Sequence, residues 1–299
     1  MHRVFVTGGT GFVGRALIQA LRAEGHIVRC LVRRGSEREL KGLEAIERVE
    51  GDVLMPDPLA DSMSSCDAVV HLVGIIREFP TRGIMFEQVH IDGTKNVVDA
   101  AATAGVRRVL HMSALGTRPG ARSRYHRSKW RAEEAVRSSG LDWTIFRPSI
   151  IYGPGDGFVT LLAWMVRRLP VVPVIGSGRA RLQPIPVAQV AEGFARALDH
   201  APSIGRVYDV GGPDAHALTE VLDLIATVIK GRRAPKVHVP LSLVRPLTRL
   251  LESFPFFPLT MDQLVMLEED NVCDPAPFFQ AFGLTPVPFR VGLERMLAP

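Results

Sequence analysis

The sequence has few cysteines and no long apolar run, and both absences narrow the kind of protein it can encode. Its three cysteines, Cys30, Cys66 and Cys273, lie far apart and form no CxxC pair. We therefore expect neither a disulfide framework nor a zinc site, and we expect a reducing compartment. No stretch approaches the roughly eighteen uninterrupted apolar residues that a membrane-spanning helix requires. Because a strand and a glycine loop follow Met1 directly, without a secretion signal, we expect a cytoplasmic protein.

The chain also lacks repeats, low-complexity tracts and histidine pairs at metal-ligand spacing, so no metal is expected. We interpret His71 and His111, on predicted strands, as hydrogen-bonded core residues. Lys and Arg exceed Asp and Glu by 36 to 31, but the charges are scattered and no nucleic-acid motif accompanies them. We expect a solvated arginine-rich surface and no nucleic-acid partner.

What the chain does contain is an alternation of short apolar strands and amphipathic helices over its first half. The expected helices are Phe12 to Ala23 and Phe86 to Ala104, and the expected strands are Val4–Val6, Ile27–Val32, Ile46–Val49, Ala68–Val73, Arg108–Met112 and Trp143–Phe146. Such alternation predicts an α/β fold of the Rossmann type, with a doubly wound parallel sheet.

Beyond Pro148 the sequence pattern changes: prolines and glycines become frequent and separate shorter expected elements. We predict a nucleotide-binding domain over residues 1–150 and a smaller C-terminal α/β substrate or partner lobe over 151–299. Helices are expected at Val187–His200 and Thr219–Ile229, and strands at Arg206–Val210 and Lys236–Val239. The later strands imply that the chain revisits the main sheet and that the two regions interleave.

The glycine loop after the first strand is the strongest functional signal. Gly8, Gly11 and Gly14 fit the GxxGxxG pattern between a strand and a helix. Glycines there let the backbone turn tightly and approach a pyrophosphate, which lies at the helix N-terminus. The loop predicts dinucleotide binding.

The residues after the second strand bear on which dinucleotide is bound. Where an NAD-binding chain usually carries an acidic residue, this one has Arg33 and Arg34. A guanidinium can hold a 2′-phosphate that a carboxylate would repel, so NADP(H) is favoured over NAD(H). The alternative is that both are ordinary loop cations. Asp52, after the third strand, is a candidate for the adenine amine or simply a turn aspartate.

Tyr125 and Lys129 form a YxxxK motif at the start of a predicted helix, with four-residue spacing that places both on one face. A nearby ammonium favours the phenolate, so Lys129 is expected to lower the pKa of Tyr125 and allow acid/base catalysis. Ser113 follows the strand Arg108–Met112, at the sheet edge where ligands bind, and could orient a substrate carbonyl.

Together these motifs resemble an extended or atypical short-chain dehydrogenase/reductase, of the epimerase/dehydratase-like kind. The segments VFVTGGTGFVGRAL, IDGTKNVVDAA, SALG, YHRSK and RPSIIYGPGD carry the resemblance. HLVGIIRE, the late GGPD and LTMDQLVMLEEDN are similar to the branch that includes the NAD(P)-binding accessory subunit of respiratory complex I and its bacterial relatives. The resemblance implies further cofactor contacts at Thr10, Phe12, Val13, Val53, Val73, Gly74, Lys129, Pro148, Ser149, Ile150 and Ile151.

The sequence departs from the extended enzymes in two places. Only eleven residues separate Ser113 from Tyr125, and Gln189 stands where an aspartate is common. The first departure could hold Tyr125 out of reach, and the second weakens an epimerase analogy.

Three functions are therefore open. The first is an NADP(H)-dependent oxidoreductase acting on a carbonyl or alcohol, with a lipophilic or quinone-related substrate implied by the resemblance. The second is a redox-inactive NADPH-binding structural or assembly protein, and the third is a nucleotide-sugar epimerase or dehydratase. An apolar, proline-rich stretch at 239–258 is either core or a surface for a lipophilic substrate, a membrane or a respiratory-complex partner. No oligomeric state is predicted.

Overall fold

The computed structural model describes residues 1–43, 45–254, 257 and 259–297. Its internal contacts divide the chain into two compact units. The first unit comprises Met1–Pro148, Val187–Asp209 and Ala276–Leu284, and the second comprises Ser149–Pro186, Val210–Pro275 and Thr285–Pro299. Each unit therefore draws on three separate stretches of sequence.

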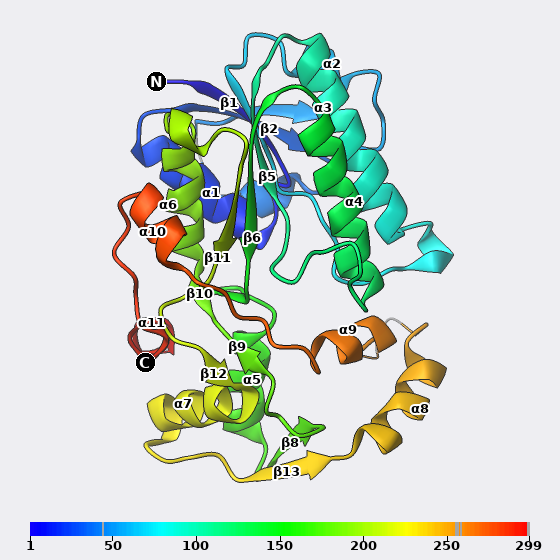
Figure 1. The fold of residues 1–299 in the computed structure, drawn as a ribbon, viewed down its shortest axis with the longest axis vertical. Coiled ribbons are helices and arrows are strands. Elements are labelled where there is room, and N and C mark those ends of the chain that lie inside the picture. The colour runs from blue at the N-terminus through cyan, green and yellow to red at the C-terminus, as the bar shows by residue number, and fades with distance from the viewer. Residues whose placement is uncertain (44, 255–256, 258, 298–299) are drawn as a thin grey trace. The chain divides into compact units, whose positions relative to one another are not determined.

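A seven-stranded sheet forms the centre of the first unit, in the order β11-β6-β5-β4-β1-β2-β3 (Figure 1). Its strands are β1 (Arg3–Thr7), β2 (Ile27–Val32), β3 (Glu47–Glu50), β4 (Ala68–His71), β5 (Arg108–Met112), β6 (Asp142–Pro148) and β11 (Arg206–Val210). β1 pairs in parallel with β2 on one side and β4 on the other, so the strand order reverses at β1. The predicted Rossmann-type parallel sheet is confirmed.

Helices cover both faces of this sheet. They are α1 (Phe12–Ala23), α2 (Leu59–Ser62), α3 (Gly93–Thr103), α4 (Arg124–Ser138), α6 (Val187–Ala197) and α10 (Ala276–Ala281). α1 and α6 pack together on one face, whereas α3 and α4 lie on the other (Figure 1). Under α3 and α4, the side chains of Phe5, Val69, Val97, Val136 and Ile145 form a buried apolar cluster. Burying both faces explains why these strands read as continuous apolar runs.

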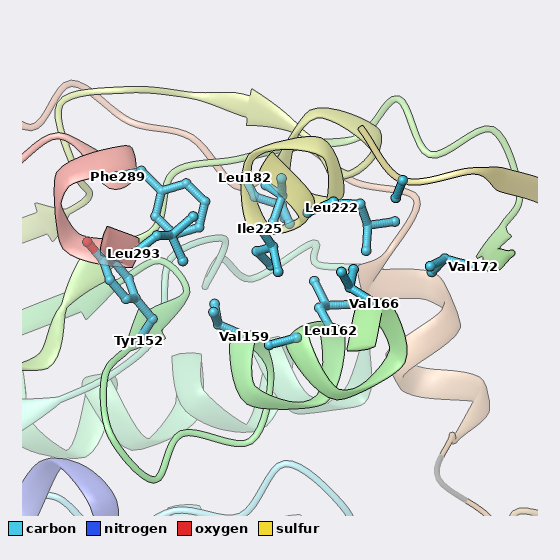
Figure 2. Close-up of a cluster of buried hydrophobic side chains, with 14 of the residues drawn as sticks. Tyr152, Val159, Leu162, Val166, Val172, Leu182, Leu222, Ile225, Phe289 and Leu293 are labelled. Atoms are coloured by element: carbon cyan, nitrogen blue, oxygen red, sulfur yellow. The ribbon is translucent and has the colours of Figure 1, made fainter. Parts of the chain in front are cut away.

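The second unit has short paired strands and its own core. Its elements are β7 (Ile151–Tyr152), α5 (Val159–Arg168), β8 (Val172–Ile175), β9 (Arg181–Leu182), β10 (Ile185–Pro186), β12 (His216–Ala217), α7 (Leu218–Lys230), β13 (Lys236–Val239), α8 (Leu241–Leu251), α9 (Met261–Met266) and α11 (Phe289–Leu297). Leu162 and Val166 of α5 pack against Leu222 and Ile225 of α7 (Figure 2). The 3.6-residue apolar period of both helices supplies this core.

One expectation about the sheet is half wrong. Arg206–Val210 joins the main sheet beside β6, as predicted, but Lys236–Val239 pairs in parallel with β8 in a separate two-stranded sheet. After α7 the chain remains in the second unit, where β13 pairs with β8 and the Val172 N–H donates to the Pro235 carbonyl oxygen at 2.8 Å. Strand propensity cannot distinguish these partners, because it reports local pattern and not the edge that a strand meets.

Among the described residues, no helix combines the length and the apolar character needed to cross a membrane. Most of the apolar stretch at 239–258 forms β13 and α8, while its residues 255, 256 and 258 lie outside the described part of the chain. The described cysteines are free thiols.

Candidate nucleotide and catalytic site

The glycine loop forms the turn that links β1 to α1. Gly8 adopts a left-handed φ of +75°, and the Gly11 N–H donates to the Gly8 carbonyl oxygen at 3.0 Å. Gly11 is the N-cap of α1, and among the described residues no side chain caps the N–H groups of its first turn. The helix therefore begins with unsatisfied donors and a partial positive charge, which suit a phosphate.

Each glycine of the loop has a different steric role. A Cβ on Gly14 would lie 2.2 Å from the Gly8 carbonyl oxygen, and one on Gly9 would lie 2.3 Å from the Cys30 Sγ. At Gly9 and Gly14, neighbouring protein atoms therefore leave no room for a side chain. A Cβ on Gly11 would meet only the Gly8 oxygen, at 3.2 Å, so the space above Gly11 is open. The loop thus fits a dinucleotide, because the protein packs closely against Gly9 and Gly14 and leaves space for a phosphate at Gly11.

The residues expected beside the adenosine lie after β2 and β3. Arg33 and Arg34 are exposed, and among the described residues no hydrogen bond or ion pair engages either guanidinium. Asp52 Oδ1 accepts a hydrogen bond from the Leu54 N–H at 3.0 Å, as a turn aspartate does. The two arginines are available for an anion, and contact between Asp52 and adenine remains a prediction.

The other predicted cofactor residues fall into two groups. Val73 and Gly74 follow β4, where the Val73 amide nitrogen would lie 3.1 Å from a Cβ on Gly8, and Val53 is buried after β3. Thr10, Phe12, Val13 and Pro148 also belong to the first unit, whereas Ser149, Ile150 and Ile151 belong to the second. Within that unit Ser149 is buried, and its hydroxyl donates to the Asn271 side-chain oxygen at 2.5 Å.

Tyr125 and Lys129 lie one turn apart near the start of α4. The helix is capped by Ser123, whose hydroxyl accepts from the His126 N–H at 3.1 Å. Lys129 is 3% exposed, and its Nζ donates to the Met112 carbonyl oxygen at the end of β5, at 2.7 Å. Ser113, the residue after Met112, is buried, and its hydroxyl donates to the Thr117 hydroxyl at 3.4 Å. The fold therefore brings Lys129 of the helix motif to the end of β5, the strand that Ser113 follows.

The expected activation of the phenol is not seen in this structure. Burial raises the pKa of Tyr125 to about 12, with no offsetting effect of a neighbouring charge. Burial also lowers the pKa of Lys129 to about 8, against the opposing charge of Glu133. The prediction that Lys129 lowers the pKa of Tyr125 is therefore wrong, because burial disfavours the phenolate and no charge offsets it.

His90 is a member of the site that the sequence analysis did not single out. It lies in a π-helical turn, Glu87–Asp92, that leads into α3. The Ile75 N–H donates to His90 Nε2 at 3.0 Å, so Nδ1 carries the proton and donates to the Ser128 hydroxyl at 2.8 Å. That hydroxyl donates in turn to the Tyr125 carbonyl oxygen at 2.7 Å. A π-turn is a local signal typical of functional sites, but only the fold reveals it.

The aromatic rings around Tyr125 hold its side chain in place. Its ring contacts Phe86, His90 and His126 edge-on, with centroids 5.8, 5.5 and 5.2 Å away. Burial, with a smaller effect of the Lys129 charge, lowers the pKa of His90 to about 2. The imidazole is therefore neutral at physiological pH and acts as a fixed hydrogen-bonding bridge between the segment after β4 and α4.

Two further histidines lie side by side on β4 and β5. His71 is hydrogen-bonded to the hydroxyls of Thr7 and Thr94 at 2.7 and 3.1 Å, which confirms it as a satisfied core residue. His111 stacks on it at 5.3 Å, but both of its buried ring nitrogens lack a hydrogen-bond partner among the described residues. The expectation for His111 is therefore wrong in its hydrogen bonding and right in its burial.

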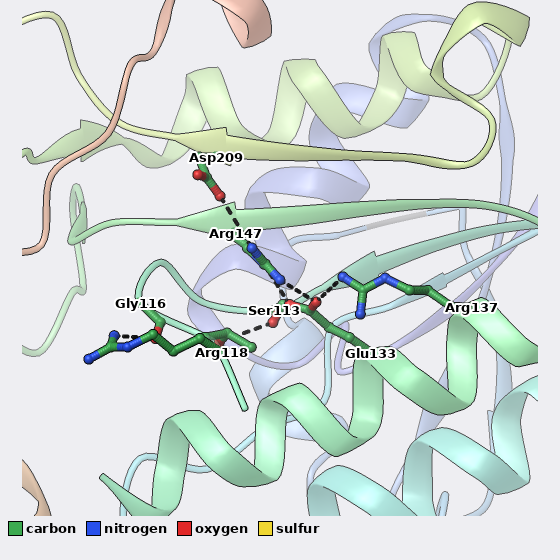
Figure 3. A network of polar contacts seen from close by, with 8 residues as sticks. Ser113, Gly116, Arg118, Glu133, Arg137, Arg147 and Asp209 are labelled. Atoms are coloured by element: carbon green, nitrogen blue, oxygen red, sulfur yellow. Dashed lines mark hydrogen bonds and ion pairs between the residues drawn. The ribbon is translucent and has the colours of Figure 1, made fainter. Parts of the chain in front are cut away.

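A buried carboxylate fixes the opposite end of α4 to the sheet (Figure 3). Glu133 is fully buried and accepts two hydrogen bonds from Arg147 of β6, at 2.8 and 2.7 Å, and one from Arg137 at 2.6 Å. Arg147 also faces Asp209 of β11 at 3.9 Å. This bidentate arrangement sets the register of α4 against β6 and so positions Tyr125 and Lys129.

A nucleotide loop, a switch in strand order and a YxxxK helix define an NAD(P)-binding protein with a Rossmann fold. A family model described as "NAD dependent epimerase/dehydratase family" matches residues 4–211. Since this match covers more than half of the chain, the protein belongs to that family, and the resemblance described for the sequence is confirmed.

Three curated relatives cover most of the chain. It is 32% identical to "NADH dehydrogenase (ubiquinone) 1 alpha subcomplex subunit 9, mitochondrial" of Arabidopsis thaliana, over 94% of this chain and 73% of the relative. It is 34% identical to "Ceramide reductase" of Caulobacter vibrioides, over 79% of this chain and 73% of the relative. It is 30% identical to "4-hydroxy-2-methyl-3-oxo-4-farnesyl-3,4-dihydroquinoline-1-oxide ketoreductase" of Stigmatella aurantiaca, over 84% and 80%.

Solved structures agree on the fold. The crystal structure of gox2253 superimposes with a TM-score of 0.79 at 26% identity and covers 100% of this chain and 97% of its own. A UDP-glucose 4-epimerase of Thermotoga maritima superimposes with a TM-score of 0.77 at 18% identity, over 99% and 97% of the two chains. At that identity the second likeness concerns the fold alone.

Proposed function

We propose that the protein is an intracellular NADP(H)-dependent oxidoreductase that reduces a carbonyl, or oxidises an alcohol, on a lipophilic substrate. The observation that carries the proposal is the placement of Tyr125 and Lys129 one turn apart on α4, with the Lys129 ammonium anchored 2.7 Å from a strand-end carbonyl. When bound, the nicotinamide supplies or accepts a hydride. Gly8, Gly11 and Gly14 would hold the pyrophosphate, and Arg33 and Arg34 would hold a 2′-phosphate.

The pKa of Tyr125 favours the reductive direction. With a pKa of about 12, the phenol keeps its proton at neutral pH. It can donate that proton to the alkoxide oxygen of a substrate whose carbonyl is being reduced, because an alkoxide is the stronger base. The Ser113 hydroxyl, buried at the end of β5, would hold the carbonyl oxygen in line.

A lipophilic substrate is supported by two of the relatives. The ceramide reductase and the farnesyl-dihydroquinoline ketoreductase are named for substrates with long apolar chains. By that analogy, the second unit, which contains most of the predicted lobe 151–299, would act as the substrate lobe. The family likeness to sugar-nucleotide epimerases rests on the fold, and it gives the nucleotide-sugar alternative less support.

A second candidate is an NADPH-binding structural or assembly protein without turnover, associated with a respiratory complex or with quinone biosynthesis. It is supported by the similarity to the complex I subunit and by the unactivated phenol of Tyr125. A ligand that binds only the folded state at a hundredfold excess over Kd stabilises it by about 2.7 kcal/mol. This stabilisation would by itself explain why the protein keeps an NADPH-binding site without turnover.

Tyr125→Phe separates these candidates. We expect NADPH oxidation with long-chain ketones and isoprenoid quinones to fall at least about a hundredfold, since general acid catalysis contributes that much. The affinity for NADPH, measured by nicotinamide fluorescence, should stay close to that of the wild type. Tyr208→Phe, which removes the same hydroxyl from β11 outside the site, is the matched control.

Undiminished turnover by Tyr125→Phe would contradict the proposed chemistry. A wild-type protein that turns over none of these substrates, but whose Tm rises with NADPH, would support the structural role instead.

A further inference from the structure

Two segments of the second unit combine exposed apolar side chains with a complete absence of acidic residues. Residues 157–181 and 224–251 contain ten Lys and Arg and neither Asp nor Glu. Every acidic residue of the second unit lies outside them. We call these two segments the cationic surface.

The two segments are neighbours in the fold. β8 pairs in parallel with β13, with Val172 opposite Lys236, and α5 packs on α7. A hollow of about 70 Å³ lies between them, lined from one side by Val166 and Pro170 and from the other by Arg232 and Arg233. The two segments therefore adjoin where β13 pairs with β8 and where α5 packs on α7.

Five of these ten cations have no partner in the part of the chain that the structure describes. Lys236 pairs with Asp223, and Arg245 pairs with Glu268 at 2.9 Å. By contrast, Arg167, Arg168, Arg232, Arg233 and Arg249 are exposed and form no hydrogen bond or ion pair with another described residue. Their charge is available to an external anion.

α8 adds an apolar stripe that faces solvent. Leu243, Leu247 and Leu250 follow the i, i+4, i+7 spacing of one helix face and are 67%, 50% and 72% exposed. Val244 and Thr248 lie on a different side and are more buried, so the stripe is not the face that packs on the protein. Arg245 and Arg249 lie toward the opposite side of the helix. Trp164 of α5, 53% exposed, extends the exposed apolar character to the neighbouring segment.

We propose that the cationic surface, including α8, docks on a membrane that contains anionic lipids. An amphipathic helix with leucines on one side and arginines on the other is suited to lie in the interface of a bilayer. The unpaired arginines of the two segments suit anionic head groups, to which each Lys or Arg contributes separately. A second copy of this chain would present only like charges to the same surface, which disfavours self-association. This inference does not depend on the proposed redox chemistry.

Sedimentation of the full chain with vesicles tests the proposal. We expect binding to vesicles of phosphatidylcholine and phosphatidylglycerol in equal amounts, little binding to phosphatidylcholine alone, and weaker binding as salt rises. Leu247→Asp with Leu250→Asp should lower the partition coefficient by about a hundredfold, because two leucines no longer enter the interface. Ile204→Asp, at a 41% exposed apolar residue of the first unit, is the matched control.

A second pair of variants tests the contribution of the arginines to vesicle binding. Arg232→Gln with Arg233→Gln should weaken binding by about tenfold or more. Arg48→Gln with Arg206→Gln changes the net charge equally on exposed strands of the first unit and should have little effect. Far-UV circular dichroism and NADPH binding verify that each variant is folded.

Three results would overturn the proposal. They are no binding to the anionic vesicles, equal binding by the leucine variant and its control, and a concentration-dependent dimer that the leucine variant abolishes while vesicles bind neither protein. None of them would affect the Tyr125→Phe test of turnover.

Discussion

The glycine loop and the Tyr125 pocket lie in the same unit, yet they differ in how much of their geometry is local. The loop is built from consecutive residues, and its tightest steric contact, that between Gly14 and Gly8, is made within it. The pocket is assembled from the π-turn before α3, the end of β5, the segment after β4 and α4. A local motif can be identified from its letters, whereas the chemistry of an assembled site depends on what the fold buries around it.

The largest expected effect comes from breaking the loop at its closed position. Gly14→Ala would force a Cβ to within 2.2 Å of the Gly8 carbonyl oxygen, so we expect a loss of about 3–4 kcal/mol of stability and of cofactor binding. Thermal denaturation and NADPH titration measure both. Gly120→Ala, where a Cβ meets no atom within 4 Å, should be nearly neutral.

Gly11→Ala refines the same comparison. Its Cβ has open space apart from the Gly8 oxygen, so the variant should fold normally but bind NADPH more weakly. Equal destabilisation by the Gly11 and Gly14 substitutions would show that the loop is a structural turn and not a phosphate-binding site.

The next effect concerns the buried clamp of the pocket. Glu133→Gln removes the carboxylate that two arginines share, and we expect a loss of about 3 kcal/mol. This value is at the low end for a buried pair, because Arg137 and Arg147 retain 27% and 17% side-chain exposure. Glu134→Gln, at the exposed neighbouring position, is the control. If urea denaturation shows equal stability for both variants, the clamp does not hold α4.

The pocket should also make stability depend on pH. The pKa values of His71 and His90 are lowered to about 3 and about 2, chiefly by burial, so the unfolded chain binds more protons than the fold below pH 6.5. Stability contributed by these groups is present above that pH and is lost as the pH falls toward their folded values, by up to about 1.4 kcal/mol per pH unit for each histidine.

Urea unfolding between pH 4 and pH 7 measures this slope in wild type and His90→Gln. The variant should show a shallower dependence, and His238→Gln, on exposed β13, tests whether loss of any histidine has the same result. An unchanged slope in His90→Gln would mean that the imidazole is not kept neutral by burial.

The smallest expected effect is at the edge of the nucleotide site. Arg33→Ala should weaken NADPH about tenfold, or about 1.4 kcal/mol, and leave NADH unchanged, because only NADPH carries the 2′-phosphate. Arg48→Ala removes another exposed arginine of the same unit as a control. A preference for NADH in the wild type would overturn the cofactor assignment.

Much of the first unit could be predicted because its signals are local. Phe12–Ala23, Arg108–Met112 and Arg206–Val210 have the predicted bounds, since apolar period and glycine punctuation define them. The partner strand of Lys236–Val239 could not be predicted, because its local sequence fits the edge of the main sheet as well as it fits β8. The role of His90 was missed because its partners, Ile75 and Ser128, are fifteen and thirty-eight residues away.

The sequence by itself determined the sheet, the glycine loop and the pairing of Tyr125 with Lys129 on one helix face, because strand period, glycine stereochemistry and helical spacing are properties of neighbouring residues. Only the tertiary structure decided the ionisation of that pair. Desolvation depends on every group packed around a side chain, and here burial keeps the proton on Tyr125 and loosens the one on Lys129.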